Sequence, residues 1–188
     1  LRNPHDSDWS LSERSGWLRL HGSPLSLDSL DTPAFVGRRQ RHVNCRVAAL
    51  LDFAPERDGE EAGLTVLMNE LHHYEVAVIH RAGLRRVILR RRIGSLSVVE
   101  AEQSLPGTEP VVLTILSTPR EYRFRWHAPG AETHELGSGE TRYLSTEVAG
   151  GFTGVYVGMY STGNGRHCSV PADFDWFDYE PLPDTCFA

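Results

Sequence analysis

The sequence contains no lysine and little cysteine. Its 19 basic residues other than histidine are all arginines, which we attribute to genome composition rather than to function. Cys45, Cys168 and Cys186 form no C-x-x-C pair and are too few for a disulfide framework, so a reducing, cytoplasmic location is expected. Cys45 lies among apolar residues and is expected to be a buried thiol. The first residue is Leu1 rather than methionine, which leaves secretion open.

Long apolar runs and net positive charge are missing as well. No run approaches the roughly 18 apolar residues that a membrane span needs, and LRNPHDSDWS has no apolar core of a signal peptide. A formal net charge of −6 argues against a nucleic-acid partner. No linker or repeat divides the chain, so we expect one domain over residues 1–188, with its core at about 9–181.

Apolar and polar residues instead alternate along much of the chain. In RHVNCRVAALLDF every second residue from Val43 to Phe53 is apolar, which predicts a half-buried antiparallel strand. The same pattern predicts strands at 64–68, 74–80, 87–93, 111–117 and 121–128. Turn-rich segments, among them 128–139, separate them. The stretch 139–150 is expected to hold one short helical turn at most. The fold class is therefore all-β, as a two-sheet antiparallel sandwich or a barrel.

The arginine-rich segment RAGLRRVILRRR is the local exception to the acidic balance. Its arginines alternate with Leu84, Val87 and Leu89. A strand with one solvated face explains this pattern better than a phosphate or polyanion site.

Three aspartates near the C-terminus, in PADFDWFDYEP, form a D-x-D-x-x-D pattern. A β-bulge at Trp176 and Phe177 would direct Asp173, Asp175 and Asp178 outward together. The favoured interpretation is that the three carboxylates face solvent on the last strand of a sheet. A hard cation such as structural Ca²⁺ is the first alternative, because Ca²⁺ binds clustered carboxylates.

A catalytic role is the second alternative for these aspartates. The pattern is similar to the E-x-D-x-x-E strand of jelly-roll glucanases, and retaining glycosidases need two carboxyl groups about 5 to 5.5 Å apart. Aspartate is shorter than glutamate, however, and little sequence remains to complete a cleft.

Histidines and aromatic residues offer weaker signals. His72 and His73 are adjacent and would point to opposite faces of a strand, so a zinc site is not expected. Exposed aromatic rings could stack on sugars, and the candidates are Trp9, Trp17, Tyr122 and Trp126. Alternating aromatics on a strand are nevertheless more typical of a core.

Three stretches in order carry a family resemblance: WSLSERSGWLRLHG, FVGRRQRHVNCRV, and GGFTGVYVGMY followed by PADFDWFDYE. They resemble the C-terminal β-sandwich domain of glycoside hydrolase family 43 β-xylosidases and α-arabinofuranosidases. The resemblance implies a concanavalin A-like jelly roll that follows a five-bladed propeller in the same chain. That propeller carries the catalytic carboxylates and is absent here, so the chain alone is expected to be inactive and to have no catalytic residues or cofactor.

The resemblance also implies site residues. A loop aromatic of the sandwich covers the active-site pocket of the propeller, and G-G-F-T-G places this role on Phe152, with Thr153 and Tyr156 on the pocket rim. The R-R-Q-x-H stretch implies contacts between the domains, from Arg38, Arg39, Gln40 and His42. The sequence departs from the usual pattern at Val43 and Tyr156, where the family often has an aromatic and a phenylalanine.

We therefore expect an accessory domain of a xylan-degrading exo-glycosidase that meets xylo-oligosaccharides through its propeller and supports homo-oligomers. A free-standing carbohydrate-binding module or lectin is the first alternative. A jelly-roll glycanase that uses Asp173, Asp175 and Asp178 is the less favoured one.

Overall fold

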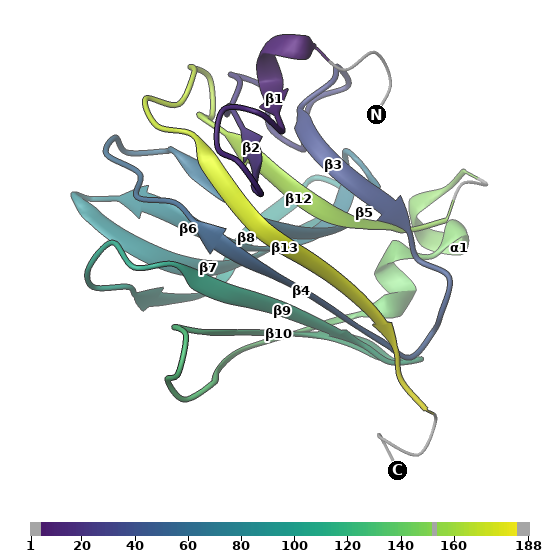
Figure 1. Cartoon of the computed structure of the whole chain (residues 1–188). Coiled ribbons are helices and arrows are strands. Elements are labelled where there is room, and N and C mark those ends of the chain that lie inside the picture. Colours follow the sequence, from purple (N-terminus) through teal and green to yellow (C-terminus); the bar gives the residue numbers. More distant parts are fainter. Residues whose placement is uncertain (1–4, 152–153, 184–188) are drawn as a thin grey trace.

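Two antiparallel sheets packed face to face make up the protein, as a computed structural model that describes residues 5–151 and 154–183 shows (Figure 1). The all-β sandwich expected from the alternation is confirmed. No helix in the described ranges is long and apolar enough to cross a membrane. Phe152 and Thr153, which the sequence places at the pocket rim, lie outside the described residues.

The first sheet has seven strands in the order β1-β2-β13-β4-β9-β10-β11. Their bounds are β1 Trp9–Ser10, β2 Leu18–Leu20, β13 Ala172–Pro181, β4 Cys45–Asp52, β9 Val111–Ser117, β10 Glu121–His127 and β11 His134–Glu140.

The second sheet has six strands in the order β3-β12-β5-β6-β7-β8. Their bounds are β3 Ala34–Arg39, β12 Tyr156–Thr162, β5 Glu61–Asn69, β6 His72–Arg81, β7 Leu84–Ile93 and β8 Leu96–Ser104. The helical segments are short, with η1 at Asp6–Asp8, η2 at Thr141–Leu144 and α1 at Thr146–Ala149.

The core forms where the inner faces of the sheets meet. Strand β10 shows how the sequence produces it, because Tyr122, Phe124 and Trp126 are buried while the residues between them are half-exposed. These aromatics therefore belong to the core, as their alternation predicts. The alternation wrongly places Val43 in the half-buried strand. Val43 is 58% exposed, because β4 begins only at Cys45.

All of strand β11 except Glu140 lies within the segment 128–139, which the sequence analysis assigned to a turn. Gly139 faces the ring of Tyr74, and a Cβ atom there would come within 2.6 Å of that ring. The Tyr74 hydroxyl donates to the Glu140 carbonyl at 2.9 Å. Packing against Tyr74 therefore requires glycine at position 139. Because glycine adds no apolar side chain to the pattern, the sequence does not show the alternation that predicts a strand.

The outer face of the second sheet carries a buried ionic network. The Arg90 guanidinium donates to Glu61 at 2.6 and 2.9 Å and also to Glu75. Tyr160 donates to Glu61 at 2.6 Å, and His73 Nε2 lies 3.0 Å from Glu75. The segment before β3 covers this face, since Leu27 packs against Tyr160 and its apolar neighbours. The solvated face that the sequence predicts for the arginine-rich strand is therefore wrong in part, because Ile88 on that face is buried and the arginines of β7 are half-buried, whereas Leu84 is exposed.

Charge pairing sets the ionisation of this network. Burial by itself would raise the pKa of Glu75, but Arg90 and His73 outweigh it and hold that pKa below its usual range. Burial by itself would lower the pKa of His73, but the hydrogen bond with Glu75 raises it. Glu75 and His73 therefore stay charged in this buried position because their partners in the network are present.

Replacement of Arg90 should show this dependence. Arg90→Ala leaves Glu61 and Glu75 buried without their cation, and should lower the free energy of unfolding by about 3–5 kcal/mol in urea titrations. The control is Arg91→Ala, whose partner Glu100 is exposed, and it should cost no more than about 1 kcal/mol. Equal losses in the two variants would contradict the buried network.

The raised pKa of His73 predicts a pH dependence. A group whose pKa is raised by folding stabilises the protein below its unfolded value, about 6.5, and loses that contribution as pH rises through the folded value. The unfolding free energy of the wild type should therefore fall more between about pH 6 and pH 9 than that of His73→Gln. Parallel pH curves for the two proteins would refute the assignment.

Candidate functional site

The candidate site lies at the edge where β3 pairs with β12. Tyr156 is opposite Arg39 in the antiparallel register, and the Gln40 backbone N–H donates to the Val155 carbonyl at 2.9 Å beyond the last pair. In Figure 1 the two strands lie side by side, and β3 ends near α1, where β12 begins. The pairing thus brings the R-R-Q-x-H segment beside the segment that follows α1, although the two are more than a hundred residues apart in sequence.

The side-chain amide of Gln40 makes its hydrogen bonds inside the sandwich. Its Nε2 donates to the His42 carbonyl at 2.9 Å and to Ser117 Oγ at 2.8 Å, and its Oε1 accepts from the Tyr122 hydroxyl at 2.9 Å. Gln40 therefore ties the turn after β3 to the opposite sheet. It shapes the turn rather than offering its own amide to a partner.

Tyr179 of β13 also holds this turn in place. Its hydroxyl accepts hydrogen bonds from the backbone N–H groups of Arg41 and His42 at 2.9 and 3.0 Å. The Arg38 guanidinium lies 4.1 Å from the centre of its ring, in cation–π geometry. The sequence analysis did not find this role of Tyr179, because an alternating pattern does not show which backbone groups a hydroxyl reaches.

Arg38, Arg39 and His42 are exposed around this fixed turn. Arg39 donates to the Tyr156 hydroxyl at 3.1 Å and lies 5.3 Å from its ring centre. These residues are therefore brought together, as the sequence expectation required. The result is a cationic, solvent-facing surface on a rigid support, suited to planar contacts with carboxylates or carbonyl groups.

The segment after α1 is anchored on both sides of residues 152–153. Before them, Asn69 Nδ2 donates to the Ala149 carbonyl at 2.9 Å; after them comes the bond from Gln40 to Val155. Gly150, Gly151 and Gly154 have φ values of 73°, 79° and 71°, a region that side-chain-bearing residues rarely adopt. Asn69 was missed by the sequence analysis, since a single asparagine in a turn carries no signal for this contact.

The three aspartates of β13 do not form one cluster. A register shift between Phe174 and Phe177 confirms the expected bulge. Asp173 is buried rather than facing solvent, and accepts from Arg19 at 2.8 and 2.9 Å and from Arg14 at 2.8 Å. Asp175 is exposed, and Asp178 lies 3.7 Å from Arg46.

Charge at Asp173 is stabilised by these arginines. Burial by itself would raise its pKa, but Arg19 and Arg14 lower it below the usual value, which does not suit a general acid. Within the described ranges, no group of three or more metal-binding side chains is arranged to hold an ion. The Ca²⁺ site stays a prediction, with the oxygens of Asp173 already bound by arginine.

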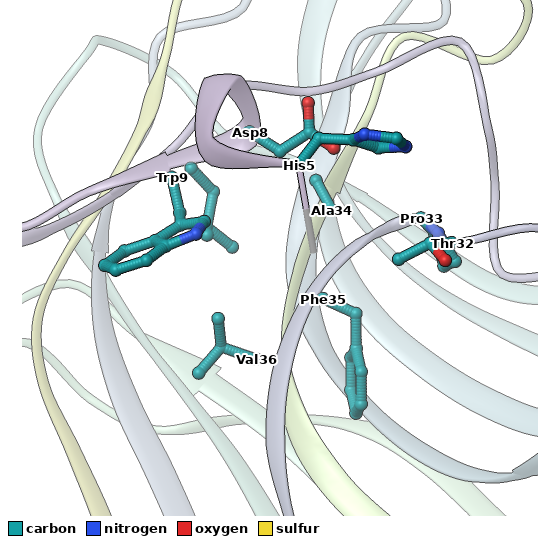
Figure 2. A pocket seen from close by; sticks show the side chains of 9 residues that line it. His5, Asp8, Trp9, Thr32, Pro33, Ala34, Phe35 and Val36 are labelled. Carbon is teal, nitrogen blue, oxygen red and sulfur yellow. The ribbon is translucent and has the colours of Figure 1, made fainter. Parts of the chain in front are cut away.

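The pocket shown in Figure 2 is too small for a substrate. Its lining comes from the N-terminal segment, from β2, and from β3 with the two residues before it. Its volume is about 10 Å³, enough for roughly one water molecule. The lining residues are His5, Asp8, Trp9, Leu20, Thr32, Pro33, Ala34, Phe35 and Val36.

Comparison with known proteins identifies the family. Residues 1–180 match the family profile described as "Beta xylosidase C-terminal Concanavalin A-like domain". The chain belongs to this family. Membership accounts for the two antiparallel sheets, and it confirms the resemblance carried by the three sequence stretches.

The relatives are longer proteins. The chain is 41% identical over 182 residues to a protein of Bacteroides ovatus named "Non-reducing end alpha-L-arabinofuranosidase BoGH43B", with 97% of the chain and 34% of the relative covered. It is 32% identical to a "Putative beta-xylosidase" of Escherichia coli, of which it covers 35%. The chain thus spans about a third of the length of these relatives.

Solved structures agree with this. The structure titled "Bacteroides ovatus Xyloglucan PUL GH43B" superposes with a TM-score of 0.93 at 41% identity, over 97% of this chain and 36% of that one. The GH43 protein BlXynB of Bacillus licheniformis superposes with a TM-score of 0.89 at 27% identity, over 96% and 36%. This domain is therefore a C-terminal part in proteins of the family.

A pair of tyrosines tests the support of the turn. Tyr179→Phe removes the acceptor of two backbone N–H groups and should lower the free energy of unfolding by about 1–3 kcal/mol. Tyr156→Phe removes a hydroxyl whose partner among the described residues is exposed Arg39, and should stay within about 0.5 kcal/mol of the wild type. Urea titration measures both. A smaller loss for Tyr179→Phe than for Tyr156→Phe would overturn the role given to Tyr179.

Proposed function

We propose that the chain is the C-terminal accessory domain of an exo-acting xylosidase or arabinofuranosidase that degrades xylan. The observation that carries the proposal is that the chain matches one third of relatives with these names. The catalytic domain, a five-bladed propeller in cis, holds the carboxylates that cleave the glycosidic bond. The sandwich packs against it and does no chemistry alone.

The edge formed by β3 and β12 is the contact with that domain in our proposal. Arg38, Arg39 and His42 are exposed there, whereas the Gln40 amide and the Tyr179 hydroxyl are occupied in holding the turn. A rigid cationic turn loses little conformational entropy when it docks, which favours it as an interface. Gln40 thus contributes to the interface through the shape of the turn.

The same edge supports the proposed pocket rim. Tyr156 begins β12 beside Arg39, and the anchors at Ala149 and Val155 lie on either side of Phe152 and Thr153. An aromatic that closes one end of the pocket would restrict it to the non-reducing end of a xylo-oligosaccharide. Its contact would act on binding and on the orientation of the substrate.

Removal of the aromatic tests this role. In the full-length enzyme, Phe152→Ala should lower kcat/KM for xylobiose at least about tenfold, which corresponds to about 1.4 kcal/mol of lost transition-state stabilisation. Its melting temperature should remain close to that of the wild type.

The control is Leu30→Ala, because Leu30 is 90% exposed and distant in sequence from the edge. It should leave both quantities unchanged. A large drop in melting temperature for Phe152→Ala with unchanged kcat/KM would show that Phe152 belongs to the core of the sandwich instead.

A further inference from the structure

An open cleft of about 360 Å³ lies where β2 and the bulge of β13 approach β12. Small-molecule sites in proteins are concave, mostly apolar and roughly 300–1,000 Å³ in size. The cleft is lined by two tryptophans, other apolar side chains and one carboxylate: Leu11, Gly16, Trp17, Leu18, Met159, Phe174, Asp175, Trp176 and Phe177. Its lining includes Met159 of β12 but neither Tyr156 nor any residue of the turn at 38–42.

One wall of the cleft, Trp17, is held in place by charge. The Arg14 guanidinium lies 3.7 Å from the centre of the Trp17 ring and stacks on it. Arg14 is itself bonded to Asp52 and Asp173, each at 2.8 Å. Because this arrangement fixes the ring before any ligand arrives, binding to it would cost little ordering of the side chain.

The bulge in β13 supplies the facing wall. Between Phe174 and Phe177 the register with β4 shifts, so Asp175 and Trp176 have no partner residue in β4. A bulge redirects side chains that strict alternation would place elsewhere, and bulges are common next to binding sites. Here it brings an indole and a carboxylate into the same cleft as Trp17.

Three hydrogen-bonding groups in the cleft have no partner in the part of the chain that the structure describes. Among the residues that the structure describes, none bonds the Asp175 carboxylate or the indole N–H groups of Trp17 and Trp176. The indole of Trp126 differs, since it donates to Gln103 Oε1 at 2.8 Å. Asp173 differs too, being bound by two arginines. The cleft therefore offers ring faces, donors and one acceptor to a ligand.

We propose that this cleft binds a short neutral saccharide, such as a β-linked xylo-oligosaccharide. Sugar rings present C–H groups that pack on indole faces, and hydroxyls that bond carboxylates and N–H groups. A polyanion is disfavoured because Asp175 is the one charged group of the lining. The choice of a xylan fragment rests on the proposed function.

Affinity electrophoresis of the full-length enzyme in gels with soluble arabinoxylan tests the proposal. The wild type should be retarded, and Trp17→Ala and Trp176→Ala should each weaken the apparent affinity at least about fivefold. Asp175→Asn should weaken it by a smaller factor. Trp9→Ala is the matched control, because Trp9 is exposed outside the cleft, and it should behave as the wild type.

Hydrolysis of nitrophenyl xyloside, measured in parallel, separates this proposal from the proposed function. The small substrate should be cleaved by the Trp17 and Trp176 variants within about twofold of the wild-type rate. Wild-type retardation that persists in both variants would overturn the saccharide site, as would a wild type that is not retarded. If both variants lose hydrolysis but keep retardation, the cleft is instead covered by the catalytic domain, and Trp176→Phe should then restore the activity.

Discussion

The antiparallel pairing of β3 with β12 is the constraint on which the functional account depends. It places Tyr156 opposite Arg39 and ends in the hydrogen bond from Gln40 to the Val155 carbonyl. Two segments that are remote in sequence thereby share one edge. Backbone pairing sets the spacing of the two segments. Side-chain substitutions therefore change the chemical groups exposed at the edge more readily than the position of the edge in the fold.

The rest of the sandwich makes this edge rigid. Gln40 bonds Ser117 and Tyr122 of the opposite sheet, while Tyr179 binds the backbone of the turn. Behind the edge, the network around Arg90 holds the central strands of the second sheet together from their outer side. Breaking a buried ion pair costs far more than forming it gains, so such a network restrains the structure even if its net contribution is small.

Much of the fold could be predicted from residue patterns, since alternation follows directly from the two faces of a half-buried strand. Strand β10 and the bulge of β13 were both predictable in this way. Edge strands β8 and β11 were not, because each pairs on one side alone and buries little apolar surface. The roles of Asp173 and Tyr179 depend on Arg14, Arg19 and the turn at 41–42, which are distant in sequence. Family resemblance supplied the candidate edge, and physical patterns alone would not have found it.

The central claim is that the edge of β3 and β12 docks on the catalytic domain of the enzyme. Amide hydrogen exchange, compared between the full-length protein and the 188-residue chain, tests it most directly. The account predicts slower exchange in the full-length protein at residues 38–42 and 154–157, with strands β7 and β8 unchanged. Unchanged exchange at these residues, together with new protection on β7 and β8, would contradict it.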